Sequence, residues 1–195
     1  MLAKYGLLLA RGFLDEATCQ SIIEETRLAP AAAATVYGRS DAGAVDERVR
    51  KALRLSPSST TVELVKSRLL EYKPDVEEYF RTSLHDLEEM QFVRYDVGDF
   101  FVAHQDGNTG LIRLDTESDR KVSIVIFLND QAEESAAGTY SGGFLKFSDY
   151  RAPAGEREFA LSGEAGMLVA FRAELTHEVT PVTAGSRYTI VSWYR

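Results

Sequence analysis

The distribution of apolar residues along the chain changes near residue 91. Before this point, apolar residues recur three and four positions apart, as on one face of a helix. After it come short runs of Val, Ile, Phe and Tyr separated by Gly, Asn, Asp and Pro, which is typical of strands. The pattern predicts an α+β protein in which N-terminal helices support a β core.

The first half of the chain contains three predicted helices. Segment 15–28 begins with acidic residues, which suit a helix N-terminus, and 58–72 carries apolar residues at helical spacing. Pro74 fits the first turn of a helix, so 74–84 is predicted as a third one. A first strand is expected within residues 1–13, and the small, polar segment 29–46 is expected to be a loop or a pair of strands.

The second half contains seven strand candidates at regular spacing, which indicates a sandwich or barrel. Loops are expected at 107–120, 130–141 and 149–163, and Gly142-Gly143 is interpreted as a turn with positive φ. The strand candidates are 91–97, 100–106, 121–129, 142–148, 166–171, 176–182 and 187–195.

Length and charge narrow the class of protein. A chain of 195 residues predicts one domain, 1–195, with helical support and substrate loops in 1–90 and the β core in 91–195. The formal net charge of −8 disfavours nucleic acid and anionic membranes as partners. The single cysteine and the lack of a long apolar run favour a soluble, cytoplasmic protein.

His104 and Asp106 stand two positions apart at the end of a predicted strand. Residues two apart on a strand point to the same face, so an imidazole nitrogen and a carboxylate would enter one space. Such a pair suits a metal ion whose third ligand comes from another strand.

Two further histidines are candidates for that third ligand. His85 follows a predicted helix among acidic residues and is interpreted as a solvated surface histidine, whereas His177 lies in a strand candidate and is preferred. Two imidazoles and one carboxylate form the facial triad of non-haem Fe(II) oxygenases, which leaves positions for an organic acid and O₂. Arg187, ten positions after His177, adds a guanidinium that can hold a carboxylate in a bidentate pair.

Taken singly, these residues leave two other classes of protein open. The same three ligands could hold Zn²⁺ with a water in the fourth position, as in a metal hydrolase. Alternatively, the polar residues could be scattered over a non-catalytic β-sandwich binding module.

From residue 91 onwards the chain resembles the Fe(II)/2-oxoglutarate-dependent dioxygenases of the prolyl hydroxylase type. The matching motifs, in family order, are RYDVGDFFVAHQD, SIVIFLND, SGGFLKF, GMLVAFRAELTHEVTPV and GSRYTIVSWYR. The resemblance implies a double-stranded β-helix (jelly-roll) core of two facing sheets with iron at the open end. It also places His177 and Arg187 on successive strands of opposite sheets.

The resemblance assigns roles to individual residues. It implies that Arg187 binds the far carboxylate of 2-oxoglutarate and that Tyr95 hydrogen-bonds this cosubstrate. Phe127 stands where some relatives carry a second tyrosine, and Trp193 matches a family tryptophan near the iron. The catalytic iron ligands implied in this way are His104, Asp106 and His177.

The implied reaction is hydroxylation of a C–H bond with succinate and CO₂ as coproducts. It requires Fe(II), 2-oxoglutarate and O₂, with ascorbate as a reductant. The expected substrate is a prolyl or other residue of a peptide or protein, over which loop 31–46 would act as a lid. A free amino acid or small metabolite is the alternative, nucleic acid is disfavoured, and the sequence does not specify the oligomeric state.

Overall fold

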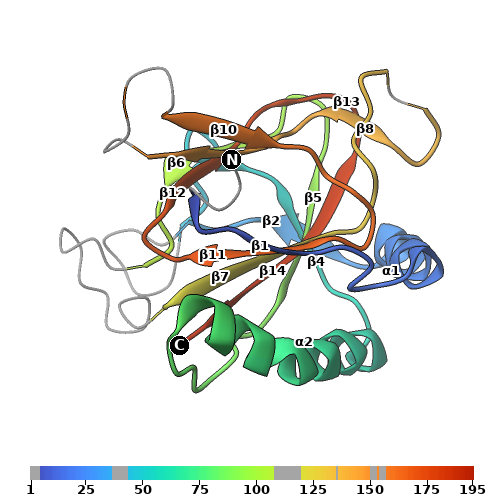
Figure 1. The fold of residues 1–195 in the computed structure, drawn as a ribbon. Helices are drawn as coiled ribbons and strands as arrows, with labels where there is room; N and C mark the ends of the chain where they lie inside the picture. Colours follow the sequence, from blue (N-terminus) through green and yellow to red (C-terminus); the bar gives the residue numbers. More distant parts are fainter. Residues whose placement is uncertain (1–4, 37–43, 108–119, 135, 150–152, 154–156) are drawn as a thin grey trace.

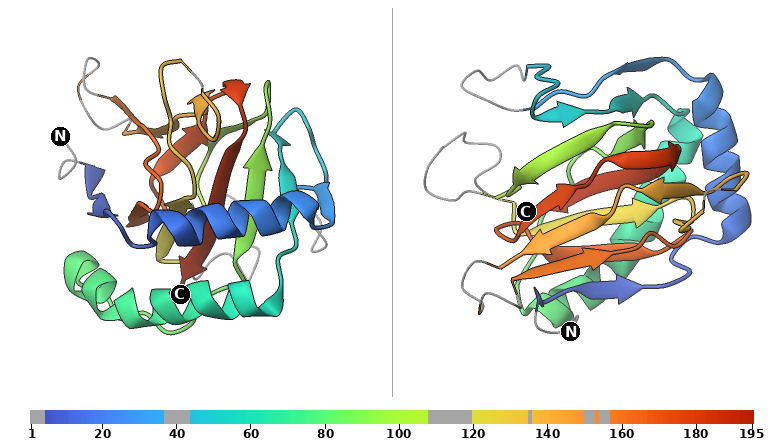
Figure 2. Two further views of the ribbon diagram at one scale, coloured as in Figure 1. Left: turned by 90° about the vertical axis from the view of Figure 1, so that its right-hand side faces the viewer. Right: turned by 90° about the horizontal axis from the view of Figure 1, so that it is seen from above.

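The core of the fold is formed by two large facing β-sheets, with helices α1 and α2 outside the larger one (Figures 1 and 2). The computed structural model describes residues 5–36, 44–107, 120–134, 136–149, 153 and 157–195. The predicted α+β class with a jelly-roll core is confirmed by this arrangement.

The described residues form three sheets. A seven-stranded sheet has the order β1-β11-β7-β14-β5-β4-β2, a five-stranded sheet the order β10-β9-β12-β6-β3, and β13 pairs with β8 alone. The strands are β1 (Leu8–Ala10), β2 (Ala31–Ala33), β3 (Arg50–Lys51), β4 (Leu53–Leu55), β5 (Gln91–Tyr95), β6 (Phe100–His104), β7 (Val122–Phe127), β8 (Tyr140–Gly142), β9 (Leu145–Ser148), β10 (Glu158–Leu161), β11 (Leu168–Arg172), β12 (Thr176–Val179), β13 (Val182–Gly185) and β14 (Arg187–Tyr194).

Strand β7 shows why the core forms where it does. All six of its residues are buried, because one face meets the helices and the other meets the second sheet. Ile124 and Ile126 belong to the helix-facing cluster, whereas Val125 and Phe127 belong to the cluster between the sheets. The inward face of β7 therefore also borders the space in which the polar residues meet.

The helices α1 (Glu16–Leu28) and α2 (Ser59–Phe80) pack on the outer face of the large sheet (Figure 2). The prediction of separate helices at 58–72 and 74–84 was wrong, because α2 runs through Pro74 without a break. Its buried residues Val65, Leu69, Val76 and Phe80 form one continuous face, and burial of that face outweighs the hydrogen bond that proline cannot donate. No described helix is long and apolar enough to cross a membrane.

Several short strands lie where the sequence predicted loops. Strands β8 and β10 lie within 130–141 and 149–163, apart from the last residue of β8, and β13 extends beyond the candidate 176–182. Part of the expected lid 31–46 is strand β2, but 37–43 lie outside the described residues, as do 108–119 of the expected loop 107–120. The first half also contributes β1 to β4 to the sheets, in addition to its helices.

Candidate metal and cosubstrate site

The HxD pair lies at the end of β6. His104 is the last residue of this strand, and Asp106 follows two positions later. The backbone N–H groups of Asp106 and Gly107 both donate to the carbonyl of Ala173, each at 2.9 Å. These bonds fix the Asp106 backbone against the connection between β11 and β12.

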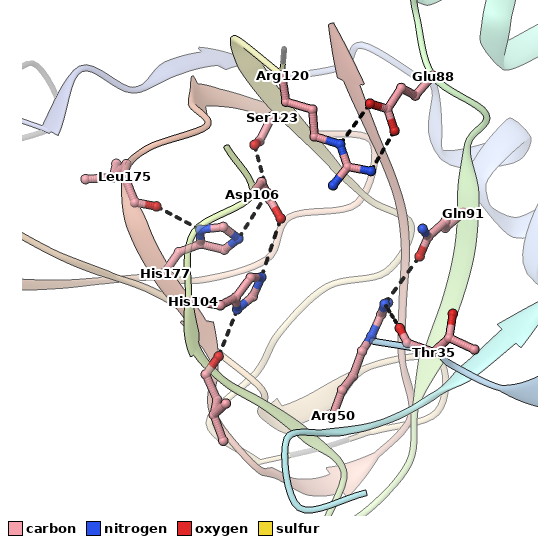
Figure 3. A network of polar contacts seen from close by, with 11 residues as sticks. Thr35, Arg50, Glu88, Gln91, His104, Asp106, Arg120, Ser123, Leu175 and His177 are labelled. Carbon is pink, nitrogen blue, oxygen red and sulfur yellow. Dashed lines mark hydrogen bonds and ion pairs between the residues drawn. The ribbon is translucent and has the colours of Figure 1, made fainter. Parts of the chain in front are cut away.

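His177 completes a cluster of three potential ligands (Figure 3). It lies on β12 directly opposite His104 on β6. Nε2 of His104 lies 3.6 Å from Oδ1 of Asp106, and Nε2 of His177 lies 3.4 Å from Oδ2. The three ligand atoms lie within 4.8 Å of one another, whereas His85 is exposed and outside this cluster.

Backbone carbonyls orient both imidazole rings. Nδ1 of His104 lies 2.8 Å from the carbonyl of Val102, and Nδ1 of His177 lies 2.9 Å from that of Leu175. A carbonyl only accepts, so each Nδ1 carries a proton and donates it to the carbonyl, while each Nε2 faces Asp106. The rings are thus held in the tautomer that binds a metal through Nε2.

Protonation also suits metal binding. Burial and the neighbouring His104 lower the pKa of His177 to about 4, so this ring is neutral at pH 7. Burial alone would raise the pKa of Asp106, but attraction to His177 and interactions with His104 and Trp193 hold it well below its usual range. Ser123 on β7 donates a 2.8 Å hydrogen bond to Oδ2 of Asp106 and supports its ionised form.

The donor set fits Fe(II). Two imidazoles and one carboxylate converge from one side, as in a facial triad, which leaves the other coordination positions for small ligands. A cavity of about 50 Å³ adjoins the three residues, whereas depressions of about 650 and 590 Å³ on the surface include none of them. The small cavity between the sheets is therefore the candidate site, because it adjoins the three potential metal ligands and the two larger depressions do not.

Arg187 reaches the same cavity from the opposite sheet. It is the first residue of β14, lies opposite Tyr95 of β5 and is only 1% exposed. Its Nη1 donates to Oγ1 of Thr189 at 3.3 Å, and its Cζ lies 5.2 and 5.1 Å from the ring centres of Tyr95 and Phe127.

The charge of Arg187 has no counter-ion among the described residues. Its Nε is buried without a hydrogen-bond partner, and no carboxylate forms an ion pair with it in this part of the chain. Burying a cation without an anion is unfavourable, so the position suits the carboxylate of a ligand. His177 and Arg187 face one cavity from opposite sheets as expected, but the short strand β13 separates their strands.

Three polar residues near the cavity were not identified from the sequence. Ser123 contacts Asp106, Arg50 lines the cavity, and Tyr140 lies beside Arg187. For Ser123 a signal was present, since it is a lone polar residue within an otherwise apolar strand. The positions of Arg50 and Tyr140 near the cavity could not be predicted from the sequence, because they depend on how strands β3 and β8 pair in the sheets.

Comparisons with known proteins agree with this geometry. The family model of the 2OG-Fe(II) oxygenase superfamily matches residues 90–195. A PKHD-type hydroxylase of Paracoccus denitrificans is 33% identical over 168 residues, which cover 82% of this chain and 66% of that protein. A PKHD-type hydroxylase of Paraburkholderia phytofirmans is 31% identical over 102 residues, or 52% of this chain and 40% of that protein. The chain thus spans less than two thirds of the length of these relatives.

Solved structures share the fold. A prolyl-4-hydroxylase from Pseudomonas putida has a TM-score of 0.69 at 23% identity, covering 100% of this chain and 94% of that one. A prolyl hydroxylase from Trichoplax adhaerens, in complex with a hypoxia inducible factor peptide fragment, has a TM-score of 0.67 at 17% identity, covering 99% and 84%.

The chain belongs to the 2OG-Fe(II) oxygenase superfamily, because the family model covers more than half of it. The Fe(II) and 2-oxoglutarate in the name of this superfamily fit the His-Asp-His cluster and the buried Arg187.

Proposed function

We propose that the protein hydroxylates a C–H bond of a prolyl or other residue in a peptide or protein, with succinate and CO₂ as coproducts. The observation that carries the proposal is the pairing, across one cavity, of a His-Asp-His cluster with a buried arginine that lacks a counter-ion. One end of the cavity suits a metal, and the other suits the far carboxylate of a keto diacid.

Each residue has a defined task in this proposal. His104, Asp106 and His177 hold Fe(II), which supplies the O₂-dependent oxidation of the C–H bond. Arg187 binds the far carboxylate of 2-oxoglutarate, and Tyr95 borders this end of the cavity. Buried apolar residues of both sheets, among them Val125 and Leu145, exclude water from the space between.

The cofactor assignment is tested by anaerobic titration of metal-free protein with Fe(II) and then 2-oxoglutarate. We expect the visible charge-transfer band of a chelated keto acid in the wild type. Asp106→Ala should abolish the band, and Arg187→Met should require far more 2-oxoglutarate to produce it. Tight Zn²⁺ binding without a band would favour the hydrolase, and absence of any metal binding would favour the binding module.

The peptide substrate rests on separate support. The curated relatives are PKHD-type hydroxylases, and one structural neighbour was solved as a prolyl hydroxylase with a peptide fragment. Arg50 lines the cavity with its Nε buried and unpartnered, and its Cζ lies 4.9 Å from the ring centre of Phe101, which stacks on His104. A donor in this position suits a backbone carbonyl of a peptide.

The substrate class is tested by measuring succinate released with Fe(II), 2-oxoglutarate and ascorbate. The panel contains prolyl peptides with basic, neutral or acidic flanks, matched peptides with alanine in place of proline, and free amino acids. We expect stimulation by prolyl peptides, strongest with basic flanks because the chain has a net charge of −8, and a mass gain of one oxygen atom. Stimulation by free amino acids alone would replace the peptide by the small-molecule alternative.

A further inference from the structure

Tyr140 presents a buried hydroxyl that the fold leaves unpaired. Its side chain is 0% exposed, and its Oη lacks a hydrogen-bond partner. Within the described part of the chain, only two other buried side-chain polar atoms share this property, Nε of Arg187 and Nε of Arg50. Because buried polar groups are nearly always hydrogen-bonded, such an atom requires an explanation.

The Tyr140 side chain lies next to that of Arg187. Strand β8 begins with Tyr140, which pairs with Gly185 of β13, two residues before Arg187. A Cβ placed on Gly143 would lie 3.1 Å from Cδ of Arg187 and 3.2 Å from Cε2 of Tyr140, so both side chains pack on this glycine. Burial raises the pKa of Tyr140 despite the opposing effect of the nearby guanidinium, so the hydroxyl keeps its proton and can donate.

Glycine also leaves room for the hydroxyl itself. A Cβ on Gly163 would lie 2.1 Å from Oη of Tyr140 and 2.7 Å from Cδ1 of Phe127, so any larger residue there would displace the hydroxyl. The ring of Phe127 is 5.1 Å from Cζ of Arg187 and contributes no hydroxyl. Tyr140 is thus the tyrosine beside Arg187 whose hydroxyl is buried and unpaired.

We propose that Tyr140 is a second binding group for the far carboxylate of 2-oxoglutarate, with its hydroxyl and Nε of Arg187 donating to the same carboxylate. The inference rests on the proposed function and deepens it. A single ligand group would satisfy two buried donors at once, which explains why the free protein leaves both without partners.

The test compares two keto acids in equilibrium binding to the anaerobic Fe(II) protein. 2-Oxoglutarate carries the far carboxylate, whereas 2-oxovalerate has the same keto acid end without it. Tyr140→Phe removes only the hydroxyl and keeps the buried ring. We expect this variant to bind 2-oxoglutarate about tenfold more weakly and 2-oxovalerate as the wild type does.

Tyr194→Phe provides a matched control. Tyr194 is also fully buried, but its hydroxyl already donates to the carbonyl of Leu69 at 2.6 Å. This variant should be less stable to denaturant while its affinity for 2-oxoglutarate stays unchanged. The comparison separates loss of a buried tyrosine hydroxyl in general from loss of the one beside Arg187.

The outcomes distinguish this inference from the proposed function. Unchanged 2-oxoglutarate affinity in Tyr140→Phe, with weakened binding in Arg187→Met, would overturn the role of Tyr140 alone. Equal loss of affinity for both keto acids in Tyr140→Phe would also overturn it, because the far carboxylate would not be involved. A wild-type protein that binds Fe(II) but not 2-oxoglutarate would overturn the proposed function as well.

Discussion

Replacing Arg187 by methionine should make the metal-free protein more stable while it removes cosubstrate binding. Arg187 is 1% exposed, and its guanidinium lacks an anionic partner among the described residues. Methionine fills a similar volume with a flexible, apolar side chain. The variant therefore removes a buried charge without opening a large cavity.

The magnitude follows from the contacts of Arg187. Burying an ion costs several kcal/mol after relaxation. The two aromatic rings near Cζ return about 0.5–2 kcal/mol each, and the 3.3 Å bond to Thr189 returns about 0.5–1 kcal/mol. We expect a net stabilisation of about 1–3 kcal/mol, and each kcal/mol raises Tm by roughly 2–4 °C in a chain of this size.

The assay is denaturant unfolding of metal-free protein, repeated with metal and 2-oxoglutarate. Wild type should gain about 2.7 kcal/mol when ligand reaches a hundred times Kd, and Arg187→Met should lose most of this gain. Arg94→Met is the control, because Arg94 on β5 already pairs with Asp96 at 3.0 Å and should change stability by less than about 1 kcal/mol. If metal-free Arg187→Met were several kcal/mol less stable than the wild type, the fold itself would stabilise the buried guanidinium. The predicted cost of burying this charge would then be wrong.

Three further predictions concern groups around the site and in α1. Ser123→Ala removes the hydrogen bond to Asp106 and should weaken Fe(II) binding about 10–100-fold in a metal titration, with the circular dichroism spectrum unchanged. Gly163→Ala should destabilise the protein by about 1–3 kcal/mol in denaturant unfolding and weaken 2-oxoglutarate binding, because its Cβ collides with Tyr140. Burial raises the pKa of the Cys19 thiol to about 11, so this thiol loses its proton at a lower pH in the unfolded chain than in the folded one. The free energy of unfolding should therefore fall as pH rises from about 9 towards 11. At pH 8 the folded thiol should react with a disulfide reagent far more slowly than in denaturant, and equal rates would contradict its burial.

The metal cluster could be nominated from sequence because its signals are local. His104 and Asp106 are two residues apart on one strand, and period-2 alternation is enough to place them together. His177 could be preferred over His85 because it lies in a strand candidate, but only the pairing of β12 with β6 brings it opposite His104. The helix break predicted at Pro74 failed for the opposite reason, because tertiary burial of one long face overrode a local preference.

The residues at the proposed cosubstrate end of the cavity were harder to predict, because their sequence context does not distinguish a binding residue from a structural one. Tyr140 stands before a glycine pair in a predicted loop, and nothing in that stretch distinguishes a core tyrosine from a binding one. Gly143 was interpreted as a turn, and its positive φ of 59° agrees, but its second property is the space it leaves for Arg187 and Tyr140. That property exists only once β8, β13 and β14 are placed together.

The location of the unpaired groups links stability to function. Of the buried side-chain polar atoms in the described residues, the three without partners belong to Arg50, Tyr140 and Arg187. Arg50 and Arg187 line the cavity beside the metal cluster, and Tyr140 adjoins Arg187. The other buried side-chain polar atoms of the described residues have hydrogen-bond partners, so the unpaired buried side-chain donors gather where ligands would satisfy them. It follows that metal and 2-oxoglutarate together should stabilise this protein more than either does alone, because each ligand completes a different end of one cavity.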